Sequence, residues 1–248
     1  YNPLVSKGAS YIHTSRRASE LIKYASNSFL ATKITFINEM ANLCEKTNVK
    51  IEDVSIGMGL DKRIGGRFLR AGPAYGGSCF PKDTKAIVST ANKFNINLSV
   101  IKSVIKSNQN RSKLLINRIY EILKNKVKNK NITFLGVTFK ANTDDMRDSP
   151  SVKMIPALAK KGAKIRYYDP TGYKEIFAKY KNVSCANSIK DSIHNADLLI
   201  IHTEWNDFKS INFQNYSKKK KFIIYDMRNI YSEAKIKAQG LKYYSIGR

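Results

Sequence analysis

One cysteine of this 248-residue chain has neighbours that suit covalent chemistry. Cys79 follows two glycines and a serine and precedes a Pro-Lys-Asp triplet in the segment AGPAYGGSCFPKD. Glycines allow backbone to approach a ligand closely, so we expect this thiol in a loop rather than in a core. Lys82 favours the nucleophilic thiolate, and Asp83 can accept or position a proton. A small buried thiol beside a turn is the alternative interpretation.

Two other groups of polar residues could assist such a thiol. Lys23 and Asn27 are four residues apart, so on a helix they share one face. An exposed polar pair is the alternative for them. The segment 60–70, LDKRIGGRFLR, combines basic residues with glycines and leads directly into the cysteine segment. Guanidinium and backbone N–H groups together suit phosphate, although ordinary surface charge also explains the basic residues.

Helices are predicted to position these groups. After an irregular connecting segment at 1–18, apolar residues recur at three- and four-residue spacing, which predicts a long helix capped by Ser19 and ending at 46–48. Three more helices are predicted at 51–59, 84–94 and 98–126. We therefore expect an all-helical central domain at 19–129, which carries the cysteine.

The pattern changes beyond residue 130. Short apolar runs at 132–137, 164–168, 197–202 and 222–226 alternate with helical or loop segments, as in a Rossmann-like parallel sheet with crossover helices. This predicts an α/β domain at 130–248 after the α domain. Asp148, Ser149 and Pro150 are predicted to cap and start its first helix, and Gly162 to end it.

Two residues follow predicted strands where such folds bind ligands. Lys140 lies beyond the first strand, at the carboxyl edge of the sheet. Asp169, in a Tyr-Asp-Pro sequence, could meet a ribose hydroxyl, but a turn is the favoured interpretation. The chain contains no G-x-G-x-x-G, so the fold alone does not identify a ligand.

Composition narrows the function classes. The net charge of +25 suggests nucleic acid, but the lysines are scattered, no nucleic-acid motif occurs, and the run ending at Lys221 is interpreted as a turn before a strand. We therefore expect solvated surface charge and no nucleic-acid partner. Three unpaired cysteines and three histidines without ligand spacing predict neither disulfides nor a metal, and they fit a reducing cytoplasm. The absence of a long apolar run predicts a soluble protein without a membrane partner.

Four stretches, in this order, resemble the UDP-glucose 6-dehydrogenase family of nucleotide-sugar 6-dehydrogenases. They are SELIKYASNSFLATKITFINEM, GLDKRIGGRFLRAGPAYGGSCFPKD, FLGVTFKANTDDMRDSP and YDMRNI. The resemblance implies that UDP-glucose is oxidised to UDP-glucuronate in two steps by two NAD. It also implies that Cys79 traps the aldehyde as a thiohemiacetal and that water releases the carboxylate from a thioester.

The resemblance assigns roles to individual residues. Lys23 and Asn27 would contact the substrate, stabilise oxyanion charge and hold the hydrolytic water, while Asp83 would assist proton transfer. Arg63 would reach the site of the neighbouring subunit in a homodimer built on the long helix. Lys82 and Arg147 would contact the dinucleotide. The remaining contacts to UDP-glucose would be made by Phe68, Leu69, Arg70, Ala71, Gly72, Tyr75, Gly76, Lys140 and Arg228.

One departure from the family is large. Family members begin with a nicotinamide-binding Rossmann domain carrying a glycine-rich fingerprint, which these residues do not supply. The sequence therefore predicts the central and C-terminal part of such an enzyme, inactive by itself. Dehydrogenases of UDP-N-acetyl sugars or GDP-mannose remain alternatives, although FPKD and RIGGRFL favour the glucose enzyme. A non-catalytic UDP-sugar-binding remnant is the alternative from another class, and a nucleic-acid-binding protein is suggested by charge alone.

Overall fold

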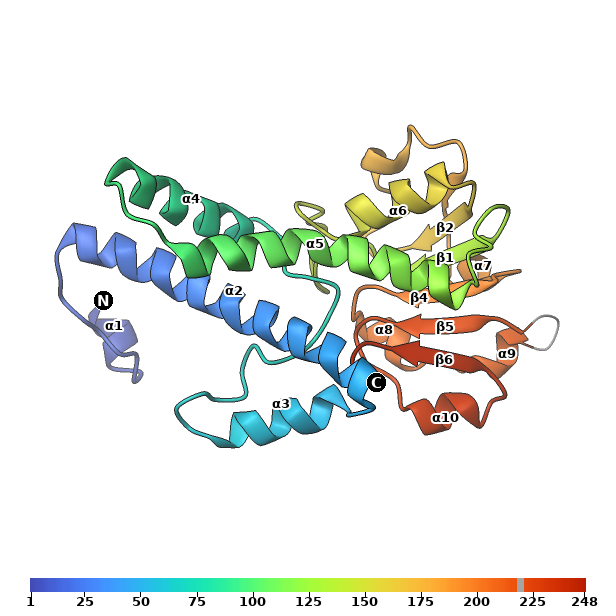
Figure 1. Ribbon diagram of the computed structural model, residues 1–248, viewed down its shortest axis with the longest axis horizontal. Coiled ribbons are helices and arrows are strands. Elements are labelled where there is room, and N and C mark those ends of the chain that lie inside the picture. The colour runs from blue at the N-terminus through green and yellow to red at the C-terminus, as the bar shows by residue number, and fades with distance from the viewer. Residues whose placement is uncertain (218–220) are drawn as a thin grey trace.

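A computed structural model describes residues 1–217 and 221–248 as an elongated molecule, with long helices at one end and a sheet at the other (Figure 1). The run of lysines predicted to form a turn lies outside the described residues, except for Lys221. The helical half contains α1 (Asn2–Val5), α2 (Arg16–Thr47), α3 (Ile51–Leu60), α4 (Cys79–Lys93) and α5 (Ser99–Ile122).

Helix α2 begins earlier than predicted. The side chain of Ser15, not Ser19, accepts a hydrogen bond from the backbone N–H of Ala18 at 3.2 Å and caps the helix. Residues 16–18 carry no large apolar side chain, so periodicity could not reveal this first turn. The helix ends at Asn48, which adopts a left-handed conformation with φ of 56°.

Helix α4 also begins earlier than predicted, at Cys79 rather than at Thr84. Pro81 occupies the first turn, where its missing N–H is not needed for a helical hydrogen bond. The expectation that the thiol lies in a loop is therefore wrong. Cys79 is the first residue of a helix, it is exposed, and the glycine-rich segment leads into it.

The second half is the predicted parallel sheet. Its strand order is β3-β2-β1-β4-β5-β6, and all neighbouring strands run parallel, which confirms the α/β prediction. The strands are β1 (Asn131–Leu135), β2 (Lys164–Tyr168), β3 (Val183–Cys185), β4 (Leu198–Ile201), β5 (Ile223–Asp226) and β6 (Lys242–Ser245). Strands β3 and β6, at the two edges, were not predicted, because neither contains a continuous apolar run.

Helices connect the strands and cover both faces of the sheet (Figure 1). They are α6 (Ser151–Lys160), η1 (Glu175–Phe177), α7 (Ile189–Ile193), α8 (Asn206–Lys209), α9 (Gln214–Ser217) and α10 (Glu233–Lys237). Helix α6 ends before Gly162, whose φ is 83°, as predicted. Its predicted side-chain cap is wrong: Pro150 is the N-cap residue, and Ser149 Oγ donates instead to the carbonyl of Val137 at 2.7 Å.

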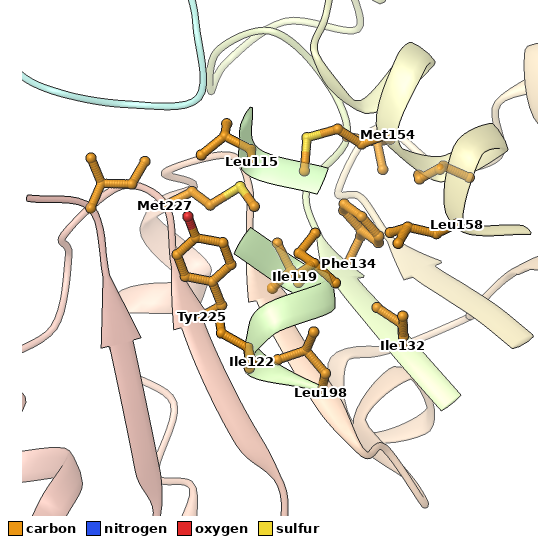
Figure 2. Packing of buried hydrophobic residues seen from close by; sticks show 14 of the residues in the cluster. Leu115, Ile119, Ile122, Ile132, Phe134, Met154, Leu158, Leu198, Tyr225 and Met227 are labelled. Atoms are coloured by element: carbon orange, nitrogen blue, oxygen red, sulfur yellow. The ribbon is translucent and has the colours of Figure 1, made fainter. Parts of the chain in front are cut away.

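One apolar core joins the two halves. Figure 2 shows Leu115, Ile119 and Ile122 of α5 lying against Phe134 and Tyr225 of the sheet. Full burial of one such aliphatic side chain contributes about 1.5–3 kcal/mol. Helix α5 is thus both part of the helical bundle and a cover for the sheet, which fixes the position of the helices relative to the strand ends. No helix in the described part of the chain is long and apolar enough to span a bilayer.

Candidate active site

Asp83 brings together the polar residues predicted on two different helices. This carboxylate on α4 is only 4% exposed and accepts a hydrogen bond of 2.5 Å from Asn27 Nδ2 on α2. Lys23 Nζ lies 3.8 Å from Asp83 Oδ2, and Lys82 Nζ lies 3.7 Å from Oδ1. A buried carboxylate requires such partners. Asn27 is therefore not part of an exposed surface pair, whereas the side chain of Lys23 remains 63% exposed.

Cys79 stands one helical turn before Asp83, on the same side of α4. Cys79 is the first residue of this 15-residue helix, where the backbone N–H groups of the first turn have no partner within the helix. The pKa of Arg147 is raised, mainly by its hydrogen bonds to Asp145 and less by the nearby charge of Cys79. Burial raises the thiol pKa of both Cys44 and Cys185, and of the three cysteines Cys79 is the exposed one.

A cleft of about 210 Å³ lies beside this cluster, between the two halves. Six of the residues predicted to contact the nucleotide sugar line it: Phe68, Arg70, Gly72, Tyr75, Gly76 and Arg228. The other lining residues were not predicted: Ile34, Ala74, Phe80, Phe139 and Glu204. Glu204 follows strand β4 at the carboxyl edge of the sheet, so its place after a predicted strand could have identified it.

The glycines before Cys79 allow the two halves to touch. A Cβ on Gly76 would lie 2.5 Å from the carbonyl oxygen of Asp148. Gly77 has a φ of 78°, and a Cβ there would lie 2.6 Å from the ring of Phe139. The N–H of Gly77 donates to the carbonyl of Arg147 at 2.7 Å. Glycine is therefore required at both positions to bring the cysteine segment against the loop after β1.

Arg228 forms the charged wall of the cleft. Its Nε donates to the carbonyl of His202 at 2.8 Å and its Nη2 donates to the carbonyl of Phe139 at 2.9 Å. The Glu204 carboxylate lies 2.8 Å from Nε. Burial lowers the pKa of Arg228, Glu204 opposes that shift, and the positive charge of Arg70 adds to it. Two guanidinium groups thus face one small cleft, an arrangement that suits a phosphorylated ligand.

Besides Lys23 and Asn27, four predicted contact residues lie outside this cleft. Arg63 is in the loop after α3, with its side chain 89% exposed and paired with Asp61. Lys140 is exposed, with its ammonium 5.4 Å from the ring centre of Phe139. Leu69 and Ala71 are buried in the main core. These four residues can therefore contact the nucleotide sugar only across a subunit interface, after a movement of the chain, or through their backbone atoms.

Asp169 serves the fold rather than a ribose. Its buried carboxylate accepts hydrogen bonds from the backbone N–H of Val137 at 2.8 Å and from the hydroxyl of Thr171 at 2.6 Å. This supports the turn interpretation, because the carboxylate holds the loops after β1 and β2 together. Among the residues that the structure describes, no cluster of His, Cys, Asp and Glu could hold a metal ion.

Comparison with known proteins agrees with this geometry. The chain matches the central domain of the UDP-glucose/GDP-mannose dehydrogenase family at residues 17–110 and the UDP binding domain of that family at residues 133–233. It is 44% identical over 250 residues to a UDP-glucose 6-dehydrogenase of Rickettsia felis, and 43% identical over 249 residues to that of Rhizobium meliloti. All of this chain aligns in both cases, with 56% and 57% of those proteins.

Solved structures show the same fold. A UDP-glucose dehydrogenase from Pyrobaculum islandicum superimposes with a TM-score of 0.82 at 30% identity, over 94% of this chain and 52% of that one. A UDP-D-ManNAc dehydrogenase from Pyrococcus horikoshii gives 0.77 at 26%, over 92% and 51%. The chain therefore spans little more than half the length of its relatives. It belongs to the UDP-glucose/GDP-mannose dehydrogenase family, of which it contains the central and UDP-binding domains.

Proposed function

We propose that this chain is the central and UDP-binding part of a UDP-glucose 6-dehydrogenase, which oxidises UDP-glucose to UDP-glucuronate with two NAD. One observation carries the proposal: Lys23 and Asn27 surround the buried Asp83, which lies one helical turn from the exposed thiol of Cys79. The 44% identity to the Rickettsia felis protein, a UDP-glucose 6-dehydrogenase, supports glucose as the sugar.

The residues around Cys79 have the functional groups that this reaction needs. The thiolate adds to the carbon of the aldehyde formed in the first oxidation, so the reactive aldehyde is not released. The Lys23 ammonium and the Asn27 amide are donors for the oxyanion that this addition creates. Asp83 keeps both donors in place and can accept a proton from the hydroxyl or from water.

The cleft supplies the binding determinants for the nucleotide. Arg70 and Arg228 can form charge-assisted hydrogen bonds with a diphosphate. The rings of Phe68 and Tyr75 pack edge-on against Phe80, with ring centres 6.1 and 6.0 Å apart, and form an apolar wall. Such a combination of few convergent charges and an apolar wall is typical of small-molecule sites.

The residues beside Cys79 also fit a dinucleotide. The side chains of Lys82 and Arg147 are 75% and 70% exposed, so a diphosphate can reach both cations, although Lys82 also lies near Asp83 and Arg147 is paired with Asp145. They would hold NAD on the open side of the thiol. When bound there, NAD accepts the hydride from the substrate carbon.

A homodimer is part of the proposal. On α2, four apolar residues recur every seven positions and remain exposed: Ile22 at 48%, Phe29 at 65%, Phe36 at 43% and Leu43 at 56%. A seven-residue repeat places them on one line of the helix, the pattern by which two helices pack side by side. We call these four residues the α2 stripe. Packing two α2 stripes together would bring the exposed Arg63 of each copy toward its partner.

The test is an assay of the gene product, including any coding sequence that precedes Tyr1, with UDP-glucose, UDP-N-acetyl sugars and GDP-mannose. Reduced cofactor is followed by absorbance. We expect UDP-glucose to be the preferred substrate and two NADH to form per glucuronate. The 248-residue chain alone should bind UDP-sugars weakly and produce no NADH. Preference for another sugar would reassign the substrate, and binding without turnover would support a non-catalytic UDP-sugar-binding protein.

A further inference from the structure

The loop that lines the cleft is held by side chains rather than by other backbone. In the described structure, the Gly77 N–H is the one backbone group of segment 67–77 that bonds to backbone elsewhere. Polar backbone groups that are buried without partners cost free energy, so the rest of the segment needs other partners. Side chains supply several of them: Ser55 of α3 donates to the carbonyl of Leu69 at 2.7 Å, and side chains of α2 and α5 hold the part nearer Cys79.

Three side chains hold two points of the loop. At Gly72, the N–H donates to Asn38 Oδ1 at 2.8 Å, and the carbonyl accepts from Arg111 Nε at 2.7 Å. At Tyr75, the N–H donates to Asn108 Oδ1 and the carbonyl accepts from Asn108 Nδ2, both at 3.0 Å. The backbone N–H and the carbonyl of Gly72 and of Tyr75 are therefore all held by side chains. We call Asn38, Asn108 and Arg111 the loop clamp.

Two residues of the loop clamp, Asn38 and Arg111, are buried at a free-energy cost. Arg111 is 4% exposed and forms no ion pair with a described carboxylate; its other hydrogen bonds go to the Asn38 carbonyl and Asn42 Oδ1. Arg111 Nη2 and Asn38 Nδ2 have no hydrogen-bond partner. Burial of an unpaired cation is expensive, and burial lowers the pKa of Arg111 to about 10, so it stays charged at neutral pH.

The loop clamp lies behind the loop and not in the cleft. Gly72 and Tyr75 line the cleft, whereas Asn38, Asn108 and Arg111 do not. A Cβ on Gly72 would lie 3.4 Å from Nη1 of Arg228, so the loop is positioned between the clamp and the charged wall. Movement of Gly72 would change the cleft directly. The clamp residues can thus affect a ligand only through the loop.

We propose that Asn38, Asn108 and Arg111 are positioning residues that keep loop 71–76 in its ligand-binding shape before the nucleotide sugar arrives. The inference rests on the proposed function, because it takes the ligand of the cleft to be a UDP-sugar. A loop that is competent only part of the time weakens apparent affinity by that fraction. If release of Tyr75 lowers the competent fraction to about one tenth, affinity falls about 10-fold.

The test compares Asn108→Ala with Asn110→Ala in the 248-residue chain. Asn108 is only partly buried, so its loss should spare the fold, and Asn110 is an exposed asparagine on the same helix. Amide hydrogen exchange of segment 71–76 is measured without ligand, and UDP-glucose affinity by calorimetry. We expect Asn108→Ala alone to speed exchange in this segment and to weaken binding about 10-fold.

A conservative variant separates positioning from general damage. Asn108→Asp keeps the acceptor for the Tyr75 N–H and loses the donor to its carbonyl, so exchange and affinity should lie between those of the wild type and Asn108→Ala. Unchanged exchange in Asn108→Ala, or faster exchange with unchanged affinity, would overturn the loop clamp and leave the proposed function intact. Failure of the unaltered chain to bind any UDP-sugar would instead overturn the proposed function and this use of the clamp, even with faster exchange.

Discussion

The two halves of the molecule differ in how many large apolar side chains they leave exposed. Among the described residues, the large exposed apolar side chains of the sheet half, 130–248, are only Tyr173 and Ile176. The helical half, 1–129, exposes many, including the whole α2 stripe. Isolated exposed apolar residues are ordinary, but a regular line of them along a 32-residue helix indicates an interface. The sheet half covers its own apolar core, whereas the helical half carries the α2 stripe, where we propose that a second copy packs.

The two halves also contribute different parts of the proposed site. The candidate nucleophile and its polar assembly belong to the helical half, where α2 and α4 meet at Asp83. The charged wall of the cleft belongs to the sheet half, where Arg228 is fixed by two backbone carbonyls. Substitutions in the helical half should therefore affect chemistry and association. Substitutions in the sheet half should affect nucleotide binding and folding.

The largest effect is expected at the thiol. In the gene product, including any coding sequence that precedes Tyr1, Cys79→Ser should lower glucuronate formation by about 10³-fold or more, because loss of a nucleophile acts on that scale. The hydroxyl is a poorer nucleophile, so the reaction should stall after the first oxidation or leave a slow ester. UDP-glucose affinity should change little, because Cys79 does not line the cleft.

Cys185→Ser is the matched control, because this partly buried thiol lies on strand β3. It should leave turnover unchanged. Product analysis by chromatography, together with calorimetry for UDP-glucose, distinguishes the two variants. Normal glucuronate formation by Cys79→Ser would remove the thiol from its proposed role.

The next effect compares two phenylalanines. Phe134→Ala, at a fully buried position in β1, should lower the free energy of unfolding by about 3–5 kcal/mol at any protein concentration. Phe29→Ala, in the α2 stripe, should cost stability only at concentrations where the dimer forms. Urea unfolding at several protein concentrations checks both. An equal, concentration-independent loss for Phe29→Ala would show that this ring is part of a monomer core.

The sheet half was easier to predict because its signal is local. The apolar run that became β4, Leu198–Ile201, is buried along its whole length, and such runs report parallel strands directly. The edge strands β3 and β6 are partly exposed, and their sequences mix apolar and polar residues. In the helical half, α4 was predicted to begin at Thr84 rather than at Cys79, because the cysteine segment was interpreted as a loop although Pro81 fits the first turn of a helix.

The candidate site was predictable where spacing defines a face and unpredictable where it depends on contacts between distant segments. Lys23 and Asn27 are four residues apart on one helix, as predicted. Cys79 and Asp83 have the same spacing on α4, but the loop expected at Cys79 concealed it, and Asp83 joins the two helices. Asn38 and Arg111 lie far from Gly72 in sequence, so no local pattern pairs them. Such contacts become visible only when the helices have packed.

Association should respond to charge in one half only. Phe29→Glu places a carboxylate in the α2 stripe and should weaken the dimer about 100-fold, because a buried unpaired charge is costly in an interface. Tyr173→Glu, at an exposed aromatic position of the sheet half, should leave association unchanged. Sedimentation equilibrium measures both. A dimer that tolerates Phe29→Glu would exclude the α2 stripe as the interface.

The smallest effect concerns the contact where the sheet half is fastened to α3. Glu52 accepts hydrogen bonds from Arg248 at 2.7 and 3.0 Å and from Asn229 at 2.6 Å. Burial acts to raise the pKa of Glu52, but these bonds outweigh it and the pKa is lowered. The charged Glu52 therefore stabilises the folded state at pH values above its unfolded pKa of about 4.3. This stabilisation is lost as the pH falls through the folded pKa. Glu52→Gln should therefore be less stable than the wild type at neutral pH by up to about 1 kcal/mol, and the urea midpoints of the two proteins should converge once the pH falls below the folded pKa of Glu52. Glu121→Gln, on the exposed end of α5, is the control. A gap of the same size at neutral pH and below the folded pKa would mean that the carboxylate charge does not fasten the two halves.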